Sequence, residues 1–199
     1  MAKQLALGAL LGLATMDGSP AHAQRTTPAV WDRPGMALHT MLGAFLPVGT
    51  RRDELAAAAW IGLQGVLRLR PALAVIGGVA GAQTADRRVS APKAELTIWQ
   101  VDVGAEGAPW TSVSASRRVA VFTGGGAGAR LYDYRGREPP RHSALVGYLS
   151  AGVEGQPGVG RGTGVRAEGR AYFSHSESGN ATGVRTEAVL TLGLTHHFR

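Results

Sequence analysis

The sequence predicts an all-β fold, an eight-stranded antiparallel up-and-down transmembrane β-barrel that follows a cleaved signal peptide. Three observations lead to this prediction. Apolar residues alternate with glycine, polar or charged residues along eight runs of about ten residues or more, the length that a tilted strand needs to cross a bilayer. The chain is 44% hydrophobic but has a mean hydropathy of -0.01, so its apolar residues are spread out. Its first residues have the pattern of an export signal.

The N-terminal residues are predicted to form a signal peptide. Lys3 supplies the positive charge, an apolar stretch begins at Leu5, and Ala21-His22-Ala23 is an A-x-A-like cleavage site. An N-terminal anchor helix is the alternative, but the run from Leu5 to Met16 has 12 residues, short of the roughly 20 that a membrane helix needs. The predicted domains are a signal peptide at 1–23, a short lead-in at 24–35 and an outer-membrane β-barrel domain at 36–199.

The last segment shows the strand period most clearly. From Ala188 to Phe198 the even positions are apolar apart from His196, and from Thr191 onward the odd positions carry threonine, glycine or histidine. Successive side chains of a strand point to opposite faces, so one face is apolar and the other is small and polar. The second run is less regular, because its alanine-rich stretch from Leu55 to Trp60 suits a helix equally well. The eight predicted strands are Met36–Leu46, Ala57–Leu69, Leu73–Gln83, Glu95–Glu106, Val119–Tyr134, Ser143–Glu154, Thr163–His175 and Arg185–Phe198.

The predicted connections differ in length. Short turns are expected at Arg70-Pro71-Ala72 and around Gly107-Ala108-Pro109, and longer polar connections at Thr84–Ala94, Arg135–His142 and Ser176–Val184. Short connections at one end and longer ones at the other are typical of transmembrane barrels.

Charged residues within the strands share the face opposite the valine, leucine and phenylalanine positions. Because an unpaired charge in an apolar setting is costly, this face is predicted to line a polar interior in which opposite charges pair. Four of these residues are basic and four are acidic, and eight strands leave room only for side chains. We therefore predict an interior filled by an ion-pair network and not an open pore. The predicted interior residues are Arg68, Asp102, Glu106, Arg130, Glu154, Arg166, Glu168 and Arg170.

The final strand resembles the C-terminal signature by which bacterial outer-membrane barrels are recognised for assembly, although Arg199 follows the last aromatic residue. The residues that would form this assembly signal are Leu190, Leu192, Leu194 and Phe198. The segments Phe45–Thr50, Arg130–Tyr134 and Arg166–Tyr172 are similar to small eight-stranded outer-membrane proteins of the OmpA/OmpX-like group.

This resemblance covers about Met36 to Phe198. It implies a monomeric barrel in the outer membrane of a bacterial cell, with roles that range from envelope stability to adhesion. It also implies outer-membrane lipid as a partner and the barrel-assembly machinery as a partner during biogenesis. We therefore expect a non-enzymatic barrel with a structural or surface-interaction role.

Composition and the remaining motifs exclude several kinds of chemistry. The chain has no cysteine, which excludes a disulfide framework, a thiolate metal site and a cysteine nucleophile. The net charge of +7 would suit nucleic acid, but no aromatic residues for base stacking interleave with the arginines, so no nucleic-acid partner is expected. The adjacent His196 and His197 point to opposite faces of a strand and cannot both bind one metal ion there, so no metal site is predicted.

Two glycine-rich segments superficially resemble phosphate-binding loops. Gly124–Gly128 and Gly158–Gly164 neither open a convincing helix nor have the spacing of such loops, so no nucleotide or other cofactor is expected. Gly124, Gly126 and Gly128 share the face of Arg130, which would clear space for long side chains of neighbouring strands.

One set of residues offers an enzymatic alternative. His175, Ser178 and Glu187 faintly resemble the His-x-Ser arrangement with a later Glu in the outer-membrane lipid A 3-O-deacylases, which are also eight-stranded barrels. A serine esterase needs a histidine within hydrogen-bond reach of the serine and an acid that orients the histidine. The spacing disagrees, because on a continuing strand His175 shares a face with Glu177 and not with Ser176. An ordinary polar loop is the competing interpretation.

Basic residues gather in the connections that are predicted to face outward. Their positive charge would pair with phosphates of lipopolysaccharide through charge-assisted hydrogen bonds. The alternative is that they serve only the solubility of the loops. The candidate contacts are Arg51, Arg52, Arg87, Arg88, Lys93, Arg135 and Arg137, with Arg141 in the same region.

A soluble exported β-barrel or sandwich that binds a ligand in its interior is the second hypothesis. In a transmembrane barrel the apolar face looks out to lipid and the charged face looks in, and in a soluble binder this assignment inverts. Charge and glycine at alternating positions favour the transmembrane barrel. The aromatic girdle is sparse, with Trp99, Phe173, Phe198 and Trp60 as its candidates.

Overall fold

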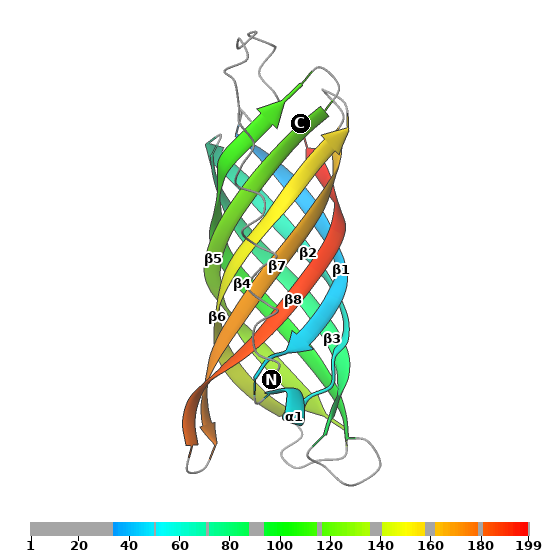
Figure 1. Ribbon diagram of the computed structural model, residues 1–199, viewed down its shortest axis with the longest axis vertical. Helices are drawn as coiled ribbons and strands as arrows, with labels where there is room; N and C mark the ends of the chain where they lie inside the picture. Colours follow the sequence, from blue (N-terminus) through cyan, green and yellow to red (C-terminus); the bar gives the residue numbers. More distant parts are fainter. Residues whose placement is uncertain are drawn as a thin grey trace, which may run out of the picture.

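The computed structural model describes residues 34–49, 51–70, 72–87, 94–114, 117–135, 141–157, 162–178 and 181–198, so the predicted signal peptide lies outside the described residues. The described strands form one closed barrel in which each strand pairs antiparallel with the next and the last pairs with the first (Figure 1). The strands are β1 Gly35–Pro47, β2 Ala58–Arg70, β3 Leu73–Asp86, β4 Ala94–Val113, β5 Arg117–Tyr134, β6 Arg141–Pro157, β7 Thr163–Ser178 and β8 Ala181–Phe198. The predicted eight-stranded antiparallel up-and-down barrel is therefore confirmed.

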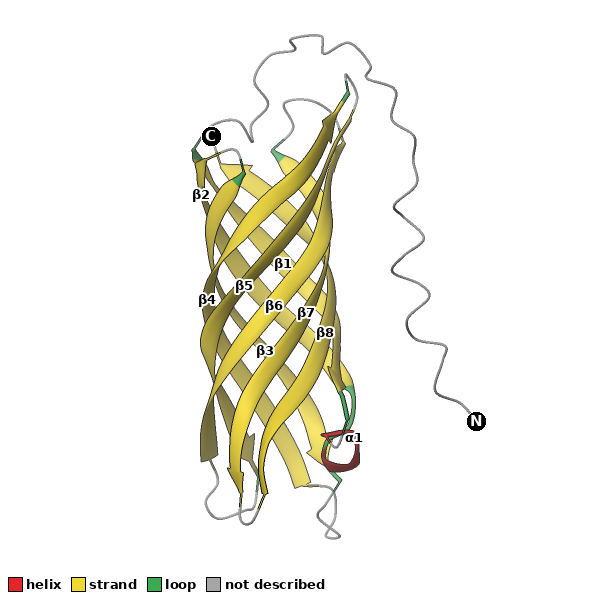
Figure 2. Cartoon of the chain, turned by 60° about the vertical axis from the view of Figure 1, so that its left-hand side comes forward, coloured by secondary structure: helices red, strands yellow, loops and turns green. Residues whose placement is uncertain are grey.

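The barrel has two distinct ends (Figure 2). One end carries the short helix α1, Arg51–Glu54, and the connections from β1 to β2, β3 to β4, β5 to β6 and β7 to β8, and we call it the α1 end. The other end holds the start of β1 and the end of β8, and we call it the terminal end. Three of the four connections at the α1 end are longer than every connection at the terminal end, as in transmembrane barrels. In the described ranges, no helix is long and apolar enough to cross a membrane.

The alternation along each strand places apolar side chains outside and polar ones inside. On β2, Ile61 and Leu63 are 68% and 46% exposed, whereas Gln64 is fully buried. The same outward apolar face continues around the barrel, with Val101 on β4 and Leu149 on β6 about as exposed. A soluble protein that binds a ligand inside would have the reverse arrangement. The structure therefore favours a barrel that faces lipid.

The predicted turn around Gly107-Ala108-Pro109 is wrong. Strand β4 continues to Val113, and its pairing with β5 shifts register between Gly107 and Trp110. Proline cannot donate to the ladder and is therefore found at bulges and edges, which is how Pro109 fits within a strand. The chain turns later, where the backbone amide of Ser114 donates to the carbonyl oxygen of Arg117 at 2.9 Å.

The predicted long connection at Ser176–Val184 is also wrong. Strands β7 and β8 continue to pair as far as Ser178 and Ala181, which leaves only 179–180 between them. Ladder hydrogen bonds use backbone groups alone, so a run of polar residues does not stop a hairpin from extending.

Exposed tryptophans lie at two levels of β4. Trp99 is 57% exposed toward the α1 end and Trp110 is 53% exposed toward the terminal end. Eleven residues of strand span about 36 Å, or about 28 Å along the axis at the usual tilt, which is close to the roughly 25 Å apolar band of transmembrane barrels. Trp60, a predicted girdle residue, is instead buried in the interior, because its even position shares the inward face with Gln64 and Arg68.

Candidate functional site in the barrel interior

The eight residues predicted to line the interior are all buried, with relative exposures between 0% and 6%. They project from strands on opposite sides of the barrel, which brings together residues that are far apart in the sequence. The strands that supply them are β2 for Arg68, β4 for Asp102 and Glu106, β5 for Arg130, β6 for Glu154, and β7 for Arg166, Glu168 and Arg170.

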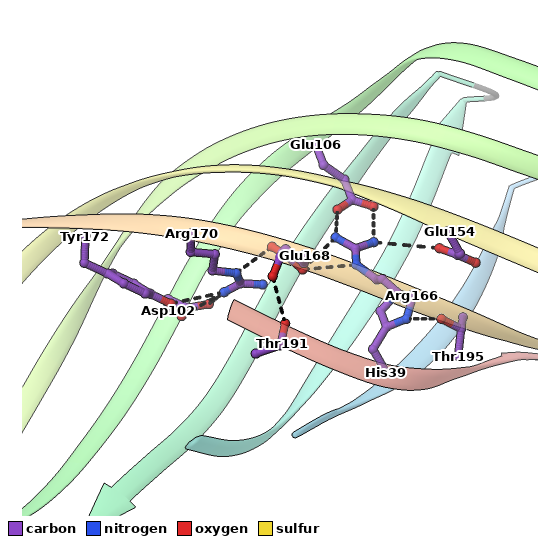
Figure 3. A network of polar contacts seen from close by, with 10 residues as sticks. All are labelled: His39, Asp102, Glu106, Glu154, Arg166, Glu168, Arg170, Tyr172, Thr191 and Thr195. Carbon is purple, nitrogen blue, oxygen red and sulfur yellow. Dashed lines mark hydrogen bonds and ion pairs between the residues drawn. The ribbon is translucent and has the colours of Figure 1, made fainter. Parts of the chain in front are cut away.

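Arg166 on β7 binds three carboxylates (Figure 3). Its Nη1 and Nη2 donate to the two carboxylate oxygens of Glu106 at 3.2 and 2.7 Å, a bidentate pair across the lumen. Its Nε donates to Glu168 at 3.0 Å, and its Nη1 lies 3.8 Å from Glu154. The guanidinium also lies over the ring of Phe122, with its Cζ 3.5 Å from the ring centroid.

Arg170, four residues further along β7 and on the same inward face, extends the same set of contacts. Its Nε donates to Glu168 at 2.6 Å, and its Nη1 lies 3.2 Å from the nearer carboxylate oxygen of Asp102. The hydroxyl of Tyr172 donates to Asp102 at 3.2 Å. Glu168 therefore joins the two arginines into one cluster, which we call the arginine–carboxylate network: Asp102, Glu106, Glu154, Arg166, Glu168 and Arg170.

On the side of the terminal end, a histidine contacts the network. The Nε2 of His197 lies 3.0 Å from Glu154, and both side chains are buried. His197 also borders a small pocket beside Arg68. On the neighbouring strand, Nδ1 of His39 forms a hydrogen bond of 2.5 Å with the hydroxyl of Thr195.

Arg130 occupies a separate environment toward the α1 end. Its Nη1 pairs with Glu187, and its Nε donates to Gln100 at 2.7 Å. Aromatic rings surround the guanidinium, whose Cζ lies 4.9 Å from the ring centroid of Tyr172 and 5.7 Å from that of Phe45. The side chains of Arg130 and Glu187 are 0% and 1% exposed. We call these two residues the Arg130–Glu187 pair.

Glycine makes room for this filling on β5. The ring of Tyr148 on β6 lies over Gly126, where a Cβ would come within 2.8 Å of the tyrosine Cε1. The backbone of β4 is closer still, since the carbonyl oxygen of Val103 would touch such a Cβ, so a larger residue at this position would collide with both the ring and the neighbouring strand.

Sequence reasoning missed several buried polar residues. Asp86, Arg118 and Glu187 bring the buried charges among the described residues to five arginines and six carboxylates. A signal for Glu187 was present, since its odd position shares the inward face with Thr191 and Thr195. Asp86 and Arg118 were missed because β3 and β5 extend beyond their predicted bounds. The other buried polar residues of the missed set are His39, Gln64, Gln100, Ser150, Gln156, Ser174 and His197.

The enzymatic alternative depends on Glu187, and the structure places this residue with Arg130. In the β7–β8 ladder Glu187 lies opposite Tyr172, whereas His175 lies opposite Val184 and Ser178 opposite Ala181. Three residues of strand separate Tyr172 from His175, which is about 10 Å. The side chains of His175 and Ser178 lie outside the described residues.

The candidate surface residues lie at both the lipid face and the α1 end. The four residues of the candidate assembly signal all point outward on β8: Leu190, Leu192, Leu194 and Phe198 are 55%, 59%, 57% and 50% exposed. Among the candidate lipopolysaccharide contacts, Arg52, Arg87 and Arg135 are exposed at the α1 end. The Nη1 of Arg87 donates to the carbonyl oxygen of Arg52 at 3.2 Å, and Arg135 forms an exposed ion pair of 3.0 Å with Glu95. The side chains of Arg51, Arg88, Lys93 and Arg137 lie outside the described residues.

Within the described part of the chain, no group of three or more histidine, cysteine or acidic residues is arranged to hold a metal ion. The buried carboxylates of the network are bound by guanidinium groups instead.

No protein-family model matches the sequence, and no curated protein matches it. The barrel is similar to the N-terminal β-barrel domain of OprF from Pseudomonas aeruginosa, with a TM-score of 0.51 at 8% sequence identity, over 83% of this chain and 100% of that one. It is also similar to Neisserial surface protein A, NspA, with a TM-score of 0.52 at 12% identity, over 83% of this chain and 96% of that one. The chain thus has the fold of the small eight-stranded barrels of the bacterial outer membrane. A fold of this kind does not specify function, which has to be argued from the side chains.

Proposed function

We propose that the chain is a non-enzymatic outer-membrane barrel with a structural or surface-interaction role, closed to ions by its own side chains. The observation that carries this proposal is the arginine–carboxylate network, whose members come from β4, β6 and β7 and meet across the lumen. Each arginine of the network binds more than one carboxylate, so an ion that entered would have to replace several fixed contacts. Eight strands leave no further width for a water column beside these side chains.

The membrane setting is tested by gel mobility of the mature chain, from about Gln24, after refolding with and without detergent. We expect a band that shifts on boiling only after refolding in detergent, because a closed barrel needs an apolar phase around its outer face. A β-rich chain that folds without detergent and shows no shift would contradict the proposal.

The closed lumen is tested by conductance across planar bilayers. The intact barrel should show no steady channel. The double variant Arg166→Ala, Arg170→Ala should conduct ions because it removes both arginines of the network. The boiling shift establishes that the variant still forms a barrel. Steady channels of the unaltered chain would contradict a filled interior.

We further propose that the α1 end contacts phosphates of lipopolysaccharide. Arg52 and Arg87 support this proposal, since both are exposed and a hydrogen bond connects them, and guanidinium groups form strong charge-assisted hydrogen bonds to phosphate. The test is retention of refolded barrel on immobilised lipopolysaccharide. The variant Arg52→Gln, Arg87→Gln should lose retention, and the control Arg70→Gln, Arg117→Gln, with two exposed arginines at the terminal end, should keep it. Equal retention of the two variants would leave the arginines at the α1 end as solubilising residues only.

The outward residues of β8 support a proposed role in assembly. Leu190, Leu192, Leu194 and Phe198 form an apolar row that is free to meet the barrel-assembly machinery before β8 closes on β1. Phe198→Ala should slow assembly into membranes that contain this machinery while leaving refolding in detergent unchanged. A variant that assembles at the rate of the unaltered chain would contradict this role.

A further inference from the structure

The outer face of the barrel contains an apolar groove. It has a volume of about 1290 Å³ and runs from Val165 on β7 over β8, β1, β2 and β3 to β4. Leu42, Ile61 and Leu194 form its walls, and each is more than half exposed. Its floor is lowered by small residues at outward positions, Ala59 on β2 and Gly81 on β3.

Trp99 closes one side of this groove. Its ring lies against Gly81, where a Cβ would come within 3.3 Å of the Trp99 Cε3. The small residue on β3 therefore gives the groove its depth, and the tryptophan on β4 gives it a wall that is 57% exposed. Small-molecule sites occupy roughly 300–1,000 Å³, so a space of this size accommodates a long hydrocarbon chain.

The groove leads toward the α1 end, where the exposed residues Arg52 and Arg87 lie near Asp53 and Glu54 of α1. The outward positions of β3 run from Gly81 through Gln83, and the same parity reaches Arg87 just beyond the strand. Six residues of extended chain cover about 20 Å. Arg87 is exposed and donates a hydrogen bond to the backbone of Arg52, so two guanidinium-bearing residues lie past this end of the groove.

We propose that the groove binds an acyl chain of a membrane lipid whose phosphate-bearing head group lies at Arg52 and Arg87. This proposal rests on the membrane setting and the basic α1 end proposed above, and it adds a defined site for one lipid on the barrel wall. Two observations argue for this occupant. The groove is apolar and lies on the outer face, and its β3 side leads toward Arg87 and Arg52, whose guanidinium groups complement an anionic phosphate.

The first arm of the experiment compares two tryptophans. Refolded barrel is placed in vesicles of phosphatidylcholine that contain a small fraction of phosphatidylglycerol with brominated acyl chains, which quench nearby tryptophan. The fluorescence of the unaltered chain minus that of the Trp99→Phe variant gives the fluorescence of Trp99. The Trp110→Phe variant gives the fluorescence of Trp110 in the same way. Trp110 is a matched control, since it is 53% exposed on the same strand and outside the groove. Trp99 should be half-quenched at a brominated fraction at least about threefold lower than Trp110, the mark of a preferred site.

The second arm fills the groove. Ala59→Leu adds bulk at an outward position of the floor, and Ala129→Leu adds the same bulk at an exposed position of β5 outside the groove. Ala59→Leu should abolish the excess quenching of Trp99, and Ala129→Leu should leave it unchanged. Val79→Phe fills the groove from β3 and repeats the test if Ala59→Leu does not refold.

The third arm removes the head-group contacts. In Arg52→Gln, Arg87→Gln the excess quenching should fall to the level given by brominated phosphatidylcholine, and Arg70→Gln, Arg117→Gln should not change it. Equal quenching of the two tryptophans, no effect of the groove-filling variants, or no effect of the arginine variants would each overturn the proposal. Weaker quenching of Trp99 than of Trp110, together with crosslinked dimers, would show a second copy in the groove and would also overturn it.

These results are separable from the proposed lipopolysaccharide contact. Retention on lipopolysaccharide depends on the arginines alone and should persist in Ala59→Leu. Loss of the groove signal with retained lipopolysaccharide binding would reject the groove and leave the basic α1 end standing.

Discussion

The interior of the barrel holds its buried charges in two different ways. Toward the α1 end, Arg130 pairs with Glu187, donates to Gln100 and lies beside the rings of Phe45, Trp60 and Tyr172. Toward the terminal end, Arg166 and Arg170 together contact four carboxylates. Glu168 is the one that binds both arginines. One region centres on one arginine–carboxylate pair among aromatic rings, and in the other a carboxylate is shared between two arginines.

This difference predicts how much stability the barrel loses when a side chain of each region is replaced. Removing one member of an isolated buried pair leaves a charge without compensation, which is strongly destabilising. Removing one carboxylate of the shared network leaves each arginine with another carboxylate partner, so the loss is smaller. The energies of members of one network are also not additive, which double-mutant cycles reveal.

The largest effect is expected for Arg130→Ala. It removes the guanidinium that pairs with the buried Glu187 and opens a cavity beside the rings of Phe45 and Trp60, at a cost of about 3–5 kcal/mol. Denaturant titration of the refolded barrel in detergent measures the change. A loss no greater than that of an exposed arginine such as Arg135 would reject the role given to the pair.

A smaller effect is expected for Glu106→Gln. Arg166 keeps Glu168 at 3.0 Å and Glu154 at 3.8 Å, so we expect a loss of about 1–3 kcal/mol. The same titration checks this value. Equal losses for Glu106→Gln and Arg130→Ala would mean that the two regions do not differ in redundancy.

Replacing both members of the Arg130–Glu187 pair should recover most of the stability. Arg130→Met with Glu187→Leu removes both charges and keeps apolar volume beside the aromatic rings, so the free energy of unfolding should lie within about 1.5 kcal/mol of the unaltered chain. The double-mutant cycle gives the coupling energy of the pair. If the double variant is as unstable as Arg130→Ala, the charges are needed for the fold and not only for each other.

The smallest effect is expected for Arg135→Gln. Its ion pair with Glu95 joins side chains that are 80% and 67% exposed, and exposed pairs contribute about 0.2–1 kcal/mol. High salt should abolish even this difference, because it screens exposed charges. A loss larger than that of Glu106→Gln would show a structural role at the α1 end that exposure alone does not predict.

Several features of the interior could be predicted from the sequence because they depend only on alternation. Arg166, Glu168 and Arg170 occupy every second position, so any strand at this segment places them on one face. The apolar residues of β8 follow the same rule on the opposite face. Trp60 follows the same rule, since its even position shares the inward face with Gln64, and its predicted place in the girdle is therefore wrong.

Other features depend on neighbouring strands and could not be predicted locally. The bulge between Gly107 and Trp110 depends on the register with β5, and the extension of β7 and β8 depends on their mutual pairing. The partners of each arginine also lie far away in the sequence, as with Arg166 and Glu106, which are 60 residues apart.

The sequence by itself therefore determined the number of strands, the face on which each side chain lies and the sign of the charges that point inward, because a period of two is a local property of the chain. Only the tertiary structure decided which charges pair, that Glu187 belongs to Arg130, and that small residues on β2 and β3 form an outer groove. These features require barrel closure, since the tilt and register of all eight strands together set which side chains meet across the lumen.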